Sequence, residues 1–197
     1  MFNFMIMLVV AIAFSITMGG PWGIIKDAAN VTESRAIGPF LIYIASIWGS
    51  ALLLFPGLFA LVTLASKRLA GVDLPYRSLM LRLSYMLVPI GIFAWIAFSL
   101  PMLMVNYSYI LVVLSDPLGL GWNLLGTANY PFKPFLPEWI PVIQGVILMA
   151  GIYFSFSRGY LAIREVIADP AARLKAMLAP AVFLLAVINI FLKLYMG

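Results

Sequence analysis

The side chains best suited to bind something within a membrane lie at the end of one long apolar segment, in the loop that follows it and at the start of the next apolar segment. They are Asn106, Tyr107, Tyr109, Trp122, Trp139 and Gln144. Amide and phenol groups can hydrogen-bond a quinone head group, a lipid or a partner subunit, and aromatic rings can stack against such a ligand. Two simpler interpretations stay open. Asn106, Gln144 and Asn189 could hydrogen-bond one another across helices, and the aromatic residues could form an interfacial belt.

Catalytic and metal chemistry is restricted by two missing residue types. The 197 residues include no cysteine and no histidine, so the chain cannot supply thiolates or imidazoles to iron–sulfur clusters, haem or copper. The carboxylates fall in connectors or at expected helix ends; they are Asp27, Glu33, Asp73, Asp116, Glu138, Glu165 and Asp169. Proton or ion coupling would require such a group inside a membrane helix. We therefore predict no catalytic, metal or cofactor-binding residue, and no enzyme activity by this chain alone.

The composition requires a membrane environment. Hydrophobic residues make up 64% of the chain and charged residues 10%, and a spanning helix needs about 20 mainly apolar residues. We expect an all-α integral membrane bundle of five transmembrane helices, forming one membrane domain over residues 1–197. The predicted helices cover about 2–17, 37–65, 83–114, 138–156 and 170–195, with an outer loop over 115–137.

The distribution of basic residues predicts the orientation. Of the twelve Lys and Arg residues, eight fall in or beside the second and fourth connectors; these are Lys67, Arg68, Arg77, Arg82, Arg158, Arg164, Arg173 and Lys175. Basic residues concentrate on the cytoplasmic side of membrane proteins, so the N-terminus is predicted inside and the C-terminus outside. The net charge of +5 reflects this bias or, alternatively, a docking surface for an acidic cytoplasmic partner; nucleic acid binding is not indicated.

Two patches of small residues predict close helix packing. Ala45, Ser46, Gly49 and Ser50 form the first, and Gly151, Ser155 and Gly159 form the second. In lipid, small residues at spacings of three and four let another helix backbone approach closely. Both patches are therefore interpreted as packing seams.

Proline positions predict several local features. Pro56-Gly57 should kink the second helix, and three prolines over 131–137 should hold the end of the outer loop as an extended strap across the membrane surface or a neighbour. Asp116-Pro117 and Asp169-Pro170 both have the pattern of a helix start, with Asp as the N-cap and Pro at the first helical position.

Two stretches resemble a known group of membrane proteins. Residues 87–98, from Leu87-Val88-Pro89 to Trp95-Ile96-Ala97-Phe98, and residues 115–128, which include Gly121-Trp122-Asn123, are similar to the membrane portion of NapH and NosR-like polyferredoxin-type electron-transfer proteins. That resemblance covers about a third of the chain. It departs from the group in lacking every cysteine cluster motif, so it implies a membrane scaffold separated from its redox module and carries over no cofactor residue.

These observations together predict an accessory or anchoring membrane subunit of a larger respiratory electron-transfer complex, in a bacterial inner membrane. Haem or iron–sulfur clusters are expected only in partner subunits. Other membrane subunits, lipids and a quinone are the expected partners. The alternative is a small homo-oligomeric transporter or channel, and a third hypothesis is a lipid-binding or assembly factor.

Overall fold

The computed structural model describes residues 2–19, 30–35 and 37–196, and no β-strand occurs in these ranges. The N-terminal part contains α1 (Phe2–Gly19), the short α3 (Val31–Ser34), α4 (Ile37–Gly49), one π-helical turn (Ser50–Leu54) and α5 (Phe55–Ala70). The remainder contains α6 (Tyr76–Ser84), α7 (Leu87–Ser115), a 3-10 turn (Pro137–Trp139), α8 (Ile140–Arg164) and α9 (Pro170–Met196).

Four stretches are long and apolar enough to cross a membrane: Ile37–Ala70, Tyr76–Ser115, Pro137–Arg164 and Pro170–Tyr195. Large apolar side chains also cover much of the outer surface, and Leu53 on the π-helical turn is 76% exposed. A monomer in water does not present apolar surface on this scale, whereas a bilayer solvates it. The chain is an integral membrane protein.

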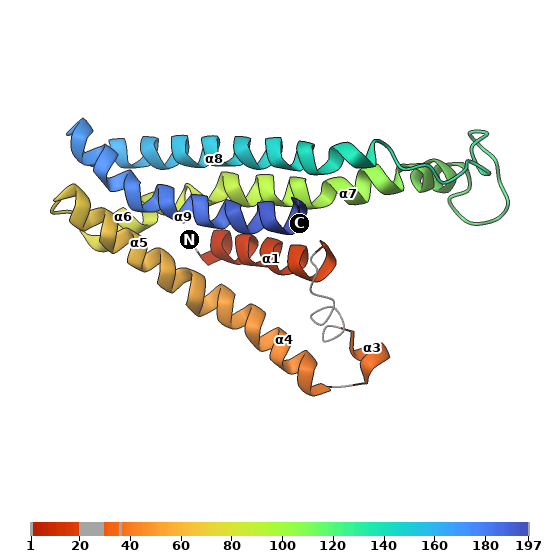
Figure 1. The fold of residues 1–197 in the computed structure, drawn as a ribbon, viewed down its shortest axis with the longest axis horizontal. Coiled ribbons are helices and arrows are strands. Elements are labelled where there is room, and N and C mark those ends of the chain that lie inside the picture. Colours follow the sequence, from red (N-terminus) through yellow and green to blue (C-terminus); the bar gives the residue numbers. More distant parts are fainter. Residues whose placement is uncertain (1, 20–29, 36, 197) are drawn as a thin grey trace.

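The helices lie roughly side by side, with α7, α8, α9 and α1 grouped closely and α4 diverging from them (Figure 1). The main interfaces are those of α7 with α8, α5 with α9, α8 with α9 and α1 with α7. One buried apolar cluster joins these helices and includes Phe59, Ile90, Leu148, Met177 and Leu184. The connectors 71–75 and 165–169 lie at the same end of the bundle, and the long loop after α7 lies beyond the opposite end (Figure 1).

The second predicted helix continues to Ala70 and changes its hydrogen-bond pattern in the middle. The Phe55 N–H bonds to the Ser50 carbonyl at the end of the π-helical turn, one residue before Pro56. Proline has no N–H, and its ring would collide with the carbonyl four residues earlier. The π-helical turn changes the backbone hydrogen bonding directly before this proline, so the helix can continue past it. Gly71, with φ +63°, then ends α5 in the left-handed conformation.

Two predicted boundaries were wrong. The third helix was predicted from about 83, but α7 begins at Leu87, after a turn at Tyr85 and Met86 that separates it from α6. Pro89 lies in the first turn of α7, where a missing N–H is tolerated. The fourth was predicted to end at 156, but α8 continues to Arg164. Its continuation passes through Gly159, which lies close to Met86 and Met177 and is not among the glycines with positive φ that could end a helix.

The two Asp-Pro pairs have opposite roles. The Asp169 carboxylate accepts the N–H groups of Ala171 at 3.3 Å and Ala172 at 2.8 Å, so Asp169 begins α9 as predicted. Asp116 instead ends α7, and its own N–H bonds to the Val112 carbonyl. The prediction of a helix start at Asp116 was wrong because Gly119 and Gly121, at φ +66° and +79°, turn the chain out of the helical region.

Candidate functional site

An extension, defined here as residues 102–139, carries most of the predicted contact residues. It consists of the C-terminal half of α7 and the loop that returns to α8, and it projects beyond the ends of the other helices (Figure 1). The Tyr76–Ser115 stretch has 40 residues, which at about 1.5 Å per residue is roughly twice the thickness of the hydrocarbon core. The 25 residues of α8 are enough to cross a bilayer. The extension is therefore longer than a membrane span requires.

The returning loop binds along α7 itself. The Phe135 N–H donates to the Met104 carbonyl at 2.9 Å, the Lys133 N–H donates to the Ser108 hydroxyl at 3.3 Å, and the Thr127 hydroxyl donates to the Leu111 carbonyl at 2.7 Å. The loop thus lies along the last part of α7, and the strap predicted over 131–137 covers this neighbour through Lys133 and Phe135.

Two predicted tyrosines hold the strap through ring contacts. Tyr107 meets Phe135 edge to face, with ring centres 5.8 Å apart, and Tyr109 meets Phe132 at 5.1 Å with the rings tilted by 31°. Aromatic pairs at such separations stabilise packing beyond their buried area. These two residues therefore have a structural role within the extension, and Tyr109 still keeps 55% of its surface exposed.

Ser115 organises the tip of the extension, defined here as residues 115–126. The sequence did not predict this role. The buried Ser115 hydroxyl donates to the Asn123 side-chain oxygen at 3.0 Å and accepts the Leu125 N–H at 3.2 Å. The neighbouring Asp116 carboxylate accepts the N–H groups of Leu120 at 2.9 Å and Gly121 at 2.8 Å. The loop satisfies these backbone groups internally. A Ser-Asp pair before closely spaced glycines was the available signal for such a turn.

The surface of the tip is strongly apolar. Five large side chains are each more than two-fifths exposed there: Leu118, Leu120, Trp122, Leu124 and Leu125. Exposed apolar clusters of this kind mark contact with lipid or with another protein. The tip supplies apolar contact area, and its carboxylate at Asp116 is already engaged by the loop.

The remaining predicted contact residues do not meet at one place. Asn106 is exposed and donates to the Met102 carbonyl of its own helix at 3.0 Å. Gln144 is 3% exposed and donates across helices to the Ala97 carbonyl at 2.8 Å. Trp139 is 53% exposed in the 3-10 turn before α8. Gln144 thus joins α8 to α7, and Asn106 lies two helical turns farther along α7.

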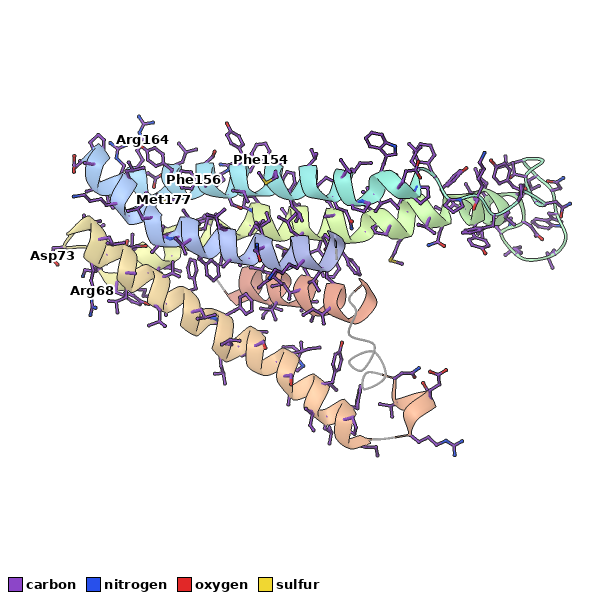
Figure 2. All side chains as sticks on the ribbon, in the orientation of Figure 1. Arg68, Asp73, Phe154, Phe156, Arg164 and Met177 are labelled. Atoms are coloured by element: carbon purple, nitrogen blue, oxygen red, sulfur yellow. The ribbon has the colours of Figure 1, made fainter. Side chains whose placement is uncertain are left out.

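Gln144 belongs to a buried stripe on α8 that includes the second small-residue patch. Gly151 faces Phe93 and Ile90 of α7 so closely that an added methyl group would lie 2.9 Å from the Phe93 Cβ. A methyl group at Gly159 would lie 3.1 Å from Met177 of α9, which is labelled in Figure 2, and 3.3 Å from Met86. Ser155, between the two glycines, is fully buried. This patch is filled by α7 and α9, as the small-residue pattern predicts.

The first small-residue patch, on α4, has a different environment. No residue of α4 is buried, and no atom would lie within 4 Å of a methyl group added at Gly49. Ser46 and Ser50 line an almost entirely apolar groove of about 190 Å³ between α4 and α1, opposite Val9 and Ile16. Within residues 2–19, 30–35 and 37–196, no helix covers this patch.

The described residues contain no group of three or more carboxylates that could hold a metal ion. The extension and the open patch on α4 offer contact surfaces for lipid or protein. No protein-family model, curated protein or solved structure matches the chain.

Proposed function

We propose that this chain is an accessory membrane subunit that binds a transmembrane helix of a partner against the open patch of Ala45, Ser46, Gly49 and Ser50, beside the groove between α1 and α4. The observation that carries this proposal is the contrast between two small-residue patches, one filled and one open. Helices in lipid associate through close packing of small residues because no hydrophobic force drives them together. A patch of the same kind without a covering helix suits a helix from another chain.

The larger assembly is proposed to be a respiratory electron-transfer complex in which partner subunits hold the haem or iron–sulfur clusters. The lack of cysteine and histidine makes a supporting role the one suited to this chain, and the resemblance to polyferredoxin-type membrane proteins indicates the type of complex. The apolar tip around Trp122 is a second contact surface, for a quinone, a lipid or a partner domain. The protein would lie in a bacterial inner membrane.

The proposed arrangement has five spans with the N-terminus inside and the C-terminus outside. Besides the four long stretches, α1 is an apolar helix of 18 residues. It packs into the bundle through Leu8 and Ala11, and the Trp95 side chain donates to the Met7 carbonyl at 3.2 Å. The connectors rich in Lys and Arg would lie in the cytoplasm, which leaves the extension on the outer side.

Extraction of the native protein in mild detergent tests this proposal. Stoichiometric recovery of a second polypeptide carrying haem or iron–sulfur absorbance supports it. A colourless homo-oligomer with ion or solute flux in liposomes would instead favour the transporter or channel alternative, and a colourless monomer would contradict both. The spectrum and the mass of the intact complex are measured on the same sample.

A further inference from the structure

A second groove lies at the opposite end of the molecule from the extension, between α6 and the last turns of α8. Its volume is about 580 Å³, within the range of small-ligand sites. The two walls are single faces of the two helices, with Leu81, Arg82 and Tyr85 on one side and Arg158, Leu161 and Glu165 on the other. The groove therefore combines two arginines and one carboxylate with apolar side chains.

The two arginines have different environments. Arg82 is held by an ion pair with Glu165, and it also donates to the Ala162 carbonyl at 3.2 Å, so its position across the groove is fixed by α8. Arg158 is exposed and forms no salt bridge within the part of the chain that the structure describes. Two guanidinium groups and one carboxylate leave one positive charge for an anion.

The depth of Arg158 favours a ligand at the membrane boundary. Arg164, the last residue of α8, lies at the same end of the bundle as Arg68 and Asp73 (Figure 2). Arg158 precedes it by six residues, or roughly 9 Å along the helix. The headgroup layer is only about 5–8 Å thick on each side of the bilayer. Arg158 therefore lies farther from the end of the bundle than Arg164 by about the thickness of that layer, and an arginine without a partner becomes more costly toward the acyl chains.

The flanks of the groove suit a ligand that is part charged and part apolar. Leu81, Tyr85 and Leu161 line it and are 44%, 58% and 50% exposed. A free inorganic anion would leave this apolar surface without contact. A lipid would place its phosphate between the arginines and its acyl chains along the leucines and the tyrosine ring.

We propose that the groove between α6 and α8 binds the phosphate group of an anionic phospholipid. Arg158 supplies the main charged contact, since guanidinium groups match phosphate oxygens in a bidentate geometry. Arg82, already oriented by Glu165, supplies a second donor. The site is separate from the α4 patch and does not depend on the proposed partner.

Native mass spectrometry of the purified full-length chain tests the proposal, with phosphatidylglycerol and phosphatidylcholine as probes. Phosphatidylglycerol should be retained in preference to phosphatidylcholine by the wild type. Arg158→Gln should weaken phosphatidylglycerol retention by about fivefold, the effect of one basic residue at an anionic membrane surface. Arg158 is exposed, so this variant should fold, and an unchanged melting temperature checks that it has.

Arg164→Gln is the matched control, because it removes the same charge from the same end of α8 without lining the groove. It should retain phosphatidylglycerol as the wild type does. Equal losses in the two variants would mean general surface attraction and overturn the proposal, as would equal retention of the two lipids by the wild type. Displacement of the lipid by millimolar inorganic phosphate would assign the groove to a free anion and overturn the lipid assignment.

Discussion

The small-residue patches on α8 and α4 have similar sequence patterns and opposite surroundings. On α8, Gly151 and Gly159 are in contact with α7 and α9 so closely that a single added carbon would press on a neighbour. On α4, Gly49 has open space around it, and the whole helix lacks a buried residue. The patch on α8 is thus covered by helices of the same chain. We infer that the patch on α4 is covered by a helix of another chain.

The largest expected effect is that of filling the closed patch. Gly151→Leu would place its side chain against the Phe93 Cβ, an atom fixed to the α7 backbone that cannot rotate away. Overpacking of this kind costs about 1–3 kcal/mol or more. We expect a large loss of stability or failure to fold, measured by unfolding of the purified protein in detergent. If Gly151→Leu unfolded like the wild type, the patch on α8 would not be closely packed and would not differ from the patch on α4.

The same substitution in the open patch should act on association instead. The first carbon of the new side chain in Gly49→Leu has no described atom within 4 Å, and replacing a helical glycine can add up to about 1 kcal/mol of helix stability. The isolated chain should remain folded, while recovery of the partner from membranes should fall by about tenfold. Full partner recovery with Gly49→Leu would remove the proposed role of the patch.

A smaller effect is expected for the polar end of the α8 stripe. Gln144→Leu removes the buried hydrogen bond to the Ala97 carbonyl, and such interhelical bonds contribute about 0.6–2 kcal/mol in membranes. We expect a loss of stability in that range, with partner recovery unchanged. Loss of the partner without loss of stability would indicate that Gln144 contributes to a contact surface rather than to internal packing.

The smallest effect should come from Ser155. Its hydroxyl is buried between the two glycines and has no hydrogen-bond partner among the described residues. Removing an unsatisfied buried polar group is neutral or stabilising. Ser155→Ala should therefore leave stability unchanged or raise it by up to about 1 kcal/mol. A clear destabilisation in the same unfolding assay would mean that the hydroxyl has a partner.

Local sequence patterns predicted the long apolar helices because each depends on hydrophobic length alone. They failed at Asp116 because the same Asp-Pro pair that begins α9 at Asp169 is followed there by a glycine-rich segment, and the positive φ angles of Gly119 and Gly121 decide the outcome. They also ended the fourth helix before Gly159, which is buried against Met86 and Met177 inside α8 and has none of the positive φ of a helix-ending glycine. Tertiary contacts overrode local propensity in that case.

For the candidate site, the sequence identified the aromatic and polar residues but could not assign their partners. Tyr107 and Tyr109 contact a strap of the same chain, and Gln144 bonds to a backbone carbonyl, which no side-chain pattern reveals. Likewise, the two small-residue patches have similar residue types and spacings in the sequence. Whether a patch is covered depends on where α7, α9 and α1 pack, so only the three-dimensional arrangement separates the two.

Photo-crosslinking in native membranes tests the central claim most directly. A photoreactive amino acid replaces Ala45 in the open patch or, as a control, Val146 on α8, which is 66% exposed and outside that patch. We expect position 45 to crosslink to a different polypeptide and position 146 to give no such crosslink. Crosslinks from position 45 only to lipid, or to a second copy of this chain, would contradict the central claim.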